Sequence, residues 1–149
     1  MLRSEHLALA THAAPAVNAV AYANDGLEAH ALAAGDDRTV ALYKLQTRER
    51  VHAFDGHSQR ILGLCVARGA ATFASCGDER AVHVWDVPSG RALRRLSAHA
   101  ARVNAVAYAG DASALLVSAS YDATVRCWDC RSRSARPVQM LLGATDSVS

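Results

Sequence analysis

The chain has 149 residues, of which 51% are hydrophobic and 20% are charged, and its formal net charge is +2. These values are typical of a soluble globular protein, and the net charge is too small to indicate binding to nucleic acid or membrane through a long-range field alone, which leaves local charged patches open. No stretch approaches the roughly 20 apolar residues that a membrane span needs. The first fifteen residues have too short an apolar run for a secretory signal. We therefore expect an intracellular protein without membrane association.

Three similar segments recur along the chain. DDRTVALYK, DERAVHVWD and YDATVRCWD align without gaps, and they place three aromatic residues at one position, about 42 to 43 residues apart: Tyr43, Trp85 and Trp128. An acidic residue in each segment and a histidine before it keep the same register: Asp37, Glu79 and Asp122, and His12, His57 and His99. A period of this length indicates repeated units that stack and bury their apolar faces against one another.

Each period contains short apolar runs that are separated by turn residues. In the second repeat we expect strands over 61–67, 71–76, 82–86 and 92–96, with turns at Gly77-Asp78 and Pro88-Ser89-Gly90 between them. Alanine-rich stretches argue against strands by propensity. The register of the repeats outweighs that objection, so the sequence predicts four strands in each repeat.

A histidine followed about 30 residues later by Trp-Asp occurs twice, as His57 with Trp85-Asp86 and as His99 with Trp128-Asp129. With this pattern the whole chain resembles the WD-repeat family. The resemblance implies an all-β fold, here a fragment of a WD40 β-propeller with three four-stranded antiparallel blades. We expect the outer strand of the closing blade in 1–15, repeats in 16–55, 56–97 and 98–142, and the start of a truncated fourth repeat in 143–149. Such a fragment is expected to self-associate, to be completed by another chain, or to come from a truncated gene model whose full product is about twice as long.

The resemblance also implies a buried hydrogen-bond network in the third repeat, made by His99, Ser118, Asp122 and Trp128. A carboxylate orients the imidazole, and the imidazole is linked through a hydroxyl to the indole. Such a network is favourable when every member is paired. The other repeats depart from the pattern: the second has His57, Ser75, Glu79 and Trp85, with glutamate in place of aspartate, and the first has His12, Asp37 and Tyr43, with Ala33 where serine is expected. We therefore expect the third blade to be the best ordered.

Two sets of residues suggest chemistry that we do not expect here. A Ser/His/Asp set suggests a hydrolase, but Ser118 lies in a predicted inner strand, whereas a nucleophile must be exposed beside its base. Cys127 and Cys130 have the spacing of a metal or redox pair. Cys127 lies in a predicted strand, where residues three apart face opposite sides of the sheet, which argues against a shared ion. His83 lies within another predicted strand and does not complete a metal cluster. We expect no catalytic residue, metal, cofactor or small-molecule substrate, and cysteines that are reduced.

A narrower resemblance lies in the run from Cys127 to Arg133, together with GHSQRILGL and DERAVHVWDVPSG. These segments are similar to WD-repeat scaffolds of the mitogen-activated protein kinase organizer family. The resemblance implies other proteins as partners, either components of a kinase cascade or of the splicing machinery. We expect the protein in the cytoplasm and the nucleus.

One face of the propeller is the expected partner-binding surface. The resemblance places contact positions at the turn before the acidic residue and at the start of the inner strand: Asp36, Arg60, Asp78, Arg102 and Tyr121. Arginine and tyrosine are enriched in interface hot spots. RNA contact is the alternative, through Arg126, Arg131, Arg133 and Arg136, although no aromatic residues are interleaved with them to stack on bases.

Overall fold

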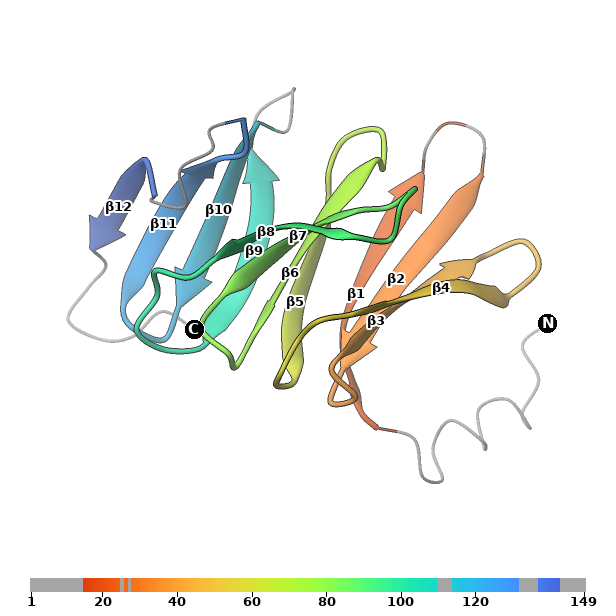
Figure 1. Cartoon of the computed structure of the whole chain (residues 1–149), viewed down its shortest axis with the longest axis horizontal. Helices are drawn as coiled ribbons and strands as arrows, with labels where there is room; N and C mark the ends of the chain where they lie inside the picture. The colour runs from red at the N-terminus through yellow and green to blue at the C-terminus, as the bar shows by residue number, and fades with distance from the viewer. Residues whose placement is uncertain (1–14, 25, 27, 110–113, 132–136, 143–149) are drawn as a thin grey trace.

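The structure is a computed structural model that describes residues 15–24, 26, 28–109, 114–131 and 137–142. These residues form three four-stranded antiparallel sheets that lie side by side (Figure 1). The part of the chain described contains no helix long and apolar enough to cross a bilayer. The predicted all-β architecture of three four-stranded blades is therefore confirmed. The expected segments 1–15 and 143–149 lie outside the described residues, apart from residue 15.

Each sheet is a meander in which consecutive strands are neighbours. The first sheet contains β1 (Val17–Asn24), β2 (Ala29–Gly35), β3 (Thr39–Lys44) and β4 (Glu49–Asp55). The second contains β5 (Ile61–Val66), β6 (Thr72–Gly77), β7 (Val82–Asp86) and β8 (Ala92–Leu96). The third contains β9 (Val103–Ala109), β10 (Leu115–Ser120), β11 (Thr124–Asp129) and β12 (Gln139–Leu142).

The first strands of the three sheets lie against one another, β1 beside β5 and β5 beside β9. The side-chain amide of Asn18 on β1 donates to the carbonyl oxygen of Ile61 on β5 at 3.2 Å. The sheets thus meet along their first strands and fan outward from them (Figure 1). This is the arrangement of consecutive propeller blades.

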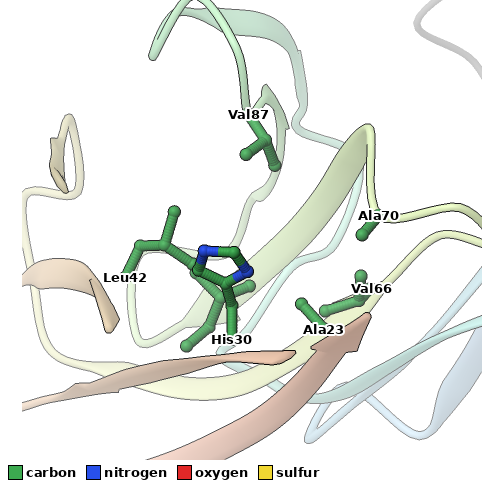
Figure 2. A pocket seen from close by; sticks show the side chains of 7 residues that line it. Ala23, His30, Leu42, Val66, Ala70 and Val87 are labelled. Carbon is green, nitrogen blue, oxygen red and sulfur yellow. The ribbon is translucent and has the colours of Figure 1, made fainter. Parts of the chain in front are cut away.

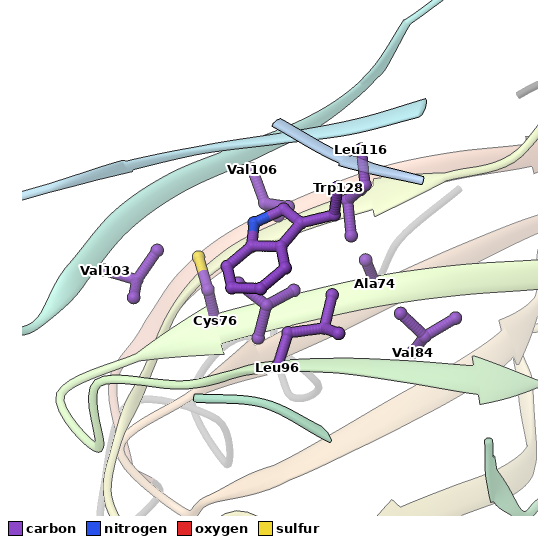
Figure 3. Close-up of a cluster of buried hydrophobic side chains, with 9 residues drawn as sticks. Ala74, Cys76, Val84, Leu96, Val103, Val106, Leu116 and Trp128 are labelled. Atoms are coloured by element: carbon purple, nitrogen blue, oxygen red, sulfur yellow. The ribbon is translucent and has the colours of Figure 1, made fainter. Parts of the chain in front are cut away.

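Two apolar cores fill the spaces between adjacent sheets. The first joins sheets one and two and includes Leu32, Phe54, Phe73 and Trp85. The second joins sheets two and three, as Figure 3 shows, and consists of Ala74, Cys76, Val82, Val84, Leu96, Val103, Val106, Leu116 and Trp128. Each tryptophan therefore packs toward the preceding sheet, so the middle sheet is covered on both faces.

The turns after β2, β6 and β10 lie along one edge of the three sheets, here named the turn edge. The same backbone hydrogen bond recurs there in each sheet: Asp36 N to Ala16 O at 3.0 Å, Asp78 N to Arg60 O at 3.2 Å, and Tyr121 N to Arg102 O at 3.0 Å. In the second sheet the close approach of the strands explains Gly77, because a Cβ there would lie 2.1 Å from the carbonyl oxygen of Arg60. The five residues expected on the partner face all belong to this edge.

Candidate functional site

The third sheet brings together His99, Ser118, Asp122 and Trp128. Nδ1 of His99 lies 3.0 Å from Oδ2 of Asp122, and Nε2 lies 2.7 Å from Oγ of Ser118. The indole N–H of Trp128 donates to the same hydroxyl oxygen at 2.9 Å. The network thus connects the loop before β9 to β10, β11 and the turn between them. Ser118 is fully buried, with its hydroxyl held between an imidazole and an indole, so it is not positioned as a nucleophile.

Burial and hydrogen bonding together set the protonation of this network. Burial lowers the pKa of His99 from its usual 6.5, although the hydrogen bond to Asp122 opposes the shift. Burial alone would raise the pKa of Asp122, but hydrogen bonds from Thr124, the Ala100 N–H and His99 outweigh it and hold the pKa below its usual 3.8. The folded state therefore favours a neutral imidazole beside an ionised carboxylate.

Acid should destabilise the fold through these two groups. Both pKa values are lower in the folded state, so the unfolded chain binds more protons as the pH falls. The free energy of unfolding is expected to decrease below about pH 6.5 as His99 takes up a proton in the unfolded chain, and to decrease further below about pH 3.8, the ordinary pKa of Asp122. Urea unfolding at a series of pH values measures this. A stability that stays level from pH 7 down to pH 4 would contradict it.

The second sheet contains an equivalent network with an additional member. Nε2 of His57 lies 2.5 Å from Oγ of Ser75, and the Trp85 indole N–H donates to that oxygen at 2.8 Å. Nδ1 of His57 contacts Oε1 of Glu79, so the longer glutamate still reaches the imidazole. Nε2 of His83 lies 2.8 Å from the same carboxylate oxygen. We expected no group of metal-ligating side chains from the sequence, yet these three residues offer ligand atoms that all lie within 4.8 Å of one another.

Among the described residues, the first sheet shows fewer of the network contacts. His12 lies outside the described residues. Oδ1 of Asp37 accepts a hydrogen bond from the Thr39 N–H at 3.3 Å. Tyr43 is only partly buried, because it points away from the first core, which Val40 and Leu42 face, and no described sheet packs against that other side. Ala33 pairs with Ala41 where Ser75 pairs with His83, so the first sheet has no hydroxyl to link such a network.

The four cysteines are free thiols. Burial raises the pKa of Cys65 and of Cys76 to about 12, which keeps both thiols protonated and unreactive. Cys130 follows the end of β11 and packs against the second core, together with Cys65. Cys65 and Cys130 therefore act as small apolar side chains at the edge of the core.

The turn edge carries the expected partner-binding residues in two adjacent pairs. Nε of Arg60 lies 2.6 Å from Oδ2 of Asp78, and the guanidinium of Arg102 lies over the Tyr121 ring at 4.7 Å from its centroid. Asp78, Arg102 and Tyr121 line an open hollow of about 500 Å³ between sheets two and three, together with Gln59, Arg80, Ala100 and Ala101. Asp36 lies at the equivalent turn of the first sheet and accepts a hydrogen bond from Asn18. Four of the five residues thus flank or line one hollow.

A second, smaller pocket lies between the first two sheets (Figure 2). It has a volume of about 70 Å³ and an apolar lining that includes Ala23, Leu42, Val66 and Val87, with His30 as its polar member. Pockets that enclose an organic ligand have volumes of roughly 300 to 1,000 Å³. The volume of this pocket lies below that range, so it does not support a site for an organic ligand.

Comparison with known proteins agrees with this architecture. The family described as "WD domain, G-beta repeat" matches residues 48–86 and 90–129. The WD repeat domain-containing protein 83 homolog of Dictyostelium discoideum is 33% identical over 134 residues, which cover 89% of this chain and 40% of the relative. The COMPASS component SWD3 of Saccharomyces cerevisiae is 33% identical over 97 residues, covering 64% of this chain and 30% of the relative. The guanine nucleotide-binding protein subunit beta of the same yeast is 28% identical over 110 residues, which cover 70% of this chain and 26% of the relative.

The chain spans less than half the length of each of these relatives. The names of these relatives refer to different cellular systems. The likeness therefore shows a shared repeat, and the role of this chain must be inferred from its own surface residues. The two matched segments make up just over half of the chain, and each contains the fourth strand of one sheet and the first three strands of the next, β4 to β7 and β8 to β11. The chain belongs to the WD40 repeat family.

Proposed function

We propose that this chain is a non-catalytic scaffold that binds another protein through the turn edge. The observation that carries the proposal is the hollow between sheets two and three, which Asp78, Arg102 and Tyr121 line. Rigid sheets support it on both sides, while the residues that line it come from turns and strand ends. Such turns can vary in sequence without disturbing the sheets, as is usual for binding surfaces.

The charge of this surface favours an acidic partner segment. Arg60, Arg80 and Arg102 lie in or beside the hollow, and of these Arg60 is paired with Asp78. The side chain of Tyr121 is half exposed beneath the Arg102 guanidinium, so it offers a flat apolar surface with a hydroxyl. Arginine and tyrosine together are suited to bind a segment that carries carboxylates and an apolar anchor.

The narrower proposal is that the partners belong to a mitogen-activated protein kinase cascade. The support is the resemblance of the run from Cys127 to Arg133, together with the surface just described. Components of the splicing machinery are the second candidate, with RNA contact as its extension. The structure weakens that extension, because Arg126 is mostly buried and directed toward Thr124 and Asp122.

Charge reversal at the turn edge should weaken capture of the partner. Arg60→Glu combined with Arg102→Glu is expected to weaken binding roughly tenfold or more, since an acidic segment would meet carboxylates in place of guanidinium groups. The measurement is affinity purification of the tagged chain followed by mass spectrometry, with and without nuclease. Partners that survive nuclease but are lost from the double variant support the scaffold.

A matched control is Arg50→Glu combined with Arg91→Glu. Both arginines are exposed, and they lie at the strand ends opposite the turn edge, so this control makes the same change in net charge. Circular dichroism of both double variants checks that the fold is retained. If the turn-edge variant recovers every partner as well as the control does, this face is not the binding surface.

A further inference from the structure

The second sheet contains a group of side chains that the scaffold function does not use. Nδ1 of His57, Oε1 of Glu79 and Nε2 of His83 converge from the loop before β5, the turn between β6 and β7, and β7 itself. The exposed fractions of these side chains are 0%, 5% and 6%. All three atoms are buried, and none makes a hydrogen bond with good geometry to a described residue, although they lie within ion-pair distance of one another.

The third sheet shows that a buried network of this type needs only one imidazole. There Asp122 contacts one imidazole, that of His99, and the position equivalent to His83 is Arg126, whose Nη2 lies 4.0 Å from Oδ2 of Asp122. The second sheet replaces this cation with a second imidazole, which brings two nitrogen ligands to one carboxylate. The rings of His57 and His83 lie with their centroids 4.2 Å apart.

We propose that His57, Glu79 and His83 bind a zinc ion. Two imidazole nitrogens and one carboxylate oxygen form a ligand set that zinc accepts, with bonds of about 2.0 to 2.2 Å and a fourth tetrahedral position left for water. The ion replaces the protons that would otherwise lie between these three atoms. Its charge also compensates the buried carboxylate, which is otherwise costly to desolvate.

Neighbouring residues orient the ligands, as outer-shell groups do in zinc sites. When Nδ1 of His57 binds the metal, its Nε2–H donates to the Ser75 hydroxyl, which already accepts from the Trp85 indole. On the other side, the backbone N–H and hydroxyl of Ser58 donate to Oε2 of Glu79 at 3.3 and 3.0 Å, leaving Oε1 to face the imidazoles. The ring of His83 stacks on Trp85, with centroids 5.7 Å apart.

Binding requires an adjustment of the three side chains. Zinc ligands in tetrahedral geometry lie roughly 3.3 Å apart, given bonds of about 2.0 Å. The carboxylate must therefore withdraw slightly from both imidazoles, and the two methylenes of Glu79 permit this. Ser58 is exposed, so the metal can enter beside it. The ion would join the connection between sheets one and two to β7, next to Asp78 of the partner-binding hollow.

The test is zinc titration of the chain after it has been stripped with a chelator. Isothermal titration calorimetry should give one zinc ion per chain. The melting temperature should rise by roughly 5 to 10 °C when free zinc is about 100 times the dissociation constant. His83→Arg copies the arrangement of the third sheet and should abolish both effects. His52→Gln removes an exposed histidine elsewhere and should change neither.

Cobalt binding gives a second measurement that does not depend on the folding of a variant. The wild-type chain should show the visible bands of tetrahedral cobalt without the near-ultraviolet band of thiolate ligands. A thiolate band would assign the metal to the cysteines and overturn the proposal. So would a wild-type melting temperature that does not respond to zinc, or His83→Arg binding zinc as the wild type does. None of these outcomes bears on partner capture at the turn edge.

Discussion

Trp128→Ala should lower the free energy of unfolding by about 3 to 5 kcal/mol. The indole is 1% exposed and packs in the second core among residues of sheets two and three (Figure 3). Its removal leaves a cavity that the surrounding strands cannot close without disturbing both sheets. It also removes the donor to the Ser118 hydroxyl, which is fully buried. This one substitution removes both the core packing and the hydrogen bond. We therefore expect one of the largest decreases in the free energy of unfolding for any single substitution in this chain.

Urea unfolding followed by circular dichroism measures this loss, and Tyr43→Ala is the matched control. Tyr43 occupies the same position in the first sheet, but it is only partly buried and its sheet has no serine to link a network. Its replacement should therefore cost clearly less. A loss below about 1 kcal/mol for Trp128→Ala, or an equal loss for Tyr43→Ala, would show that the third network does not dominate stability.

The strands could be predicted because the repeat register supplies information that local propensity lacks. In the second repeat the strands expected over 61–67, 71–76, 82–86 and 92–96 are observed at Ile61–Val66, Thr72–Gly77, Val82–Asp86 and Ala92–Leu96. The differences of one residue fall at strand ends, where turn hydrogen bonds decide the boundary. The packing order follows from the repeat in the same way, because each unit must bury its faces against its neighbours.

The role of His83 could not be predicted from the pattern of the strand. Val82 and Val84 point into the second core, so alternation correctly places His83 on the opposite face. In most antiparallel sheets that face meets water. Here it meets the first sheet, so His83 is buried beside Trp85 and Glu79. The sequence does contain a signal for this contact: a polar or charged residue stands four positions after the acidic residue, as His83 follows Glu79 and Arg126 follows Asp122.

Asp122→Ala should cost about as much stability as Trp128→Ala, in the range of about 3 to 5 kcal/mol. The carboxylate accepts hydrogen bonds from four donors: Nδ1 of His99 at 3.0 Å, the Ala100 N–H at 2.9 Å, the Thr124 N–H at 2.9 Å and the Thr124 hydroxyl at 2.5 Å. Its side chain is 8% exposed, so water cannot easily replace it. Alanine therefore leaves the donors of His99 and Thr124, which are both buried residues, without their acceptor, and each of these carries a desolvation cost.

Asp37→Ala is the control, since Asp37 has the same place in the first repeat. Among the described residues its carboxylate accepts from the Thr39 N–H at 3.3 Å, while the Thr39 hydroxyl is also bound to Asp55 at 2.9 Å. Its replacement should cost about 1 kcal/mol or less, the amount expected for a solvent-accessible turn hydrogen bond. Chemical denaturation of both variants gives the comparison. If the two losses are equal, the four donors around Asp122 are satisfied by other groups in the variant, and the carboxylate is not the centre of the network.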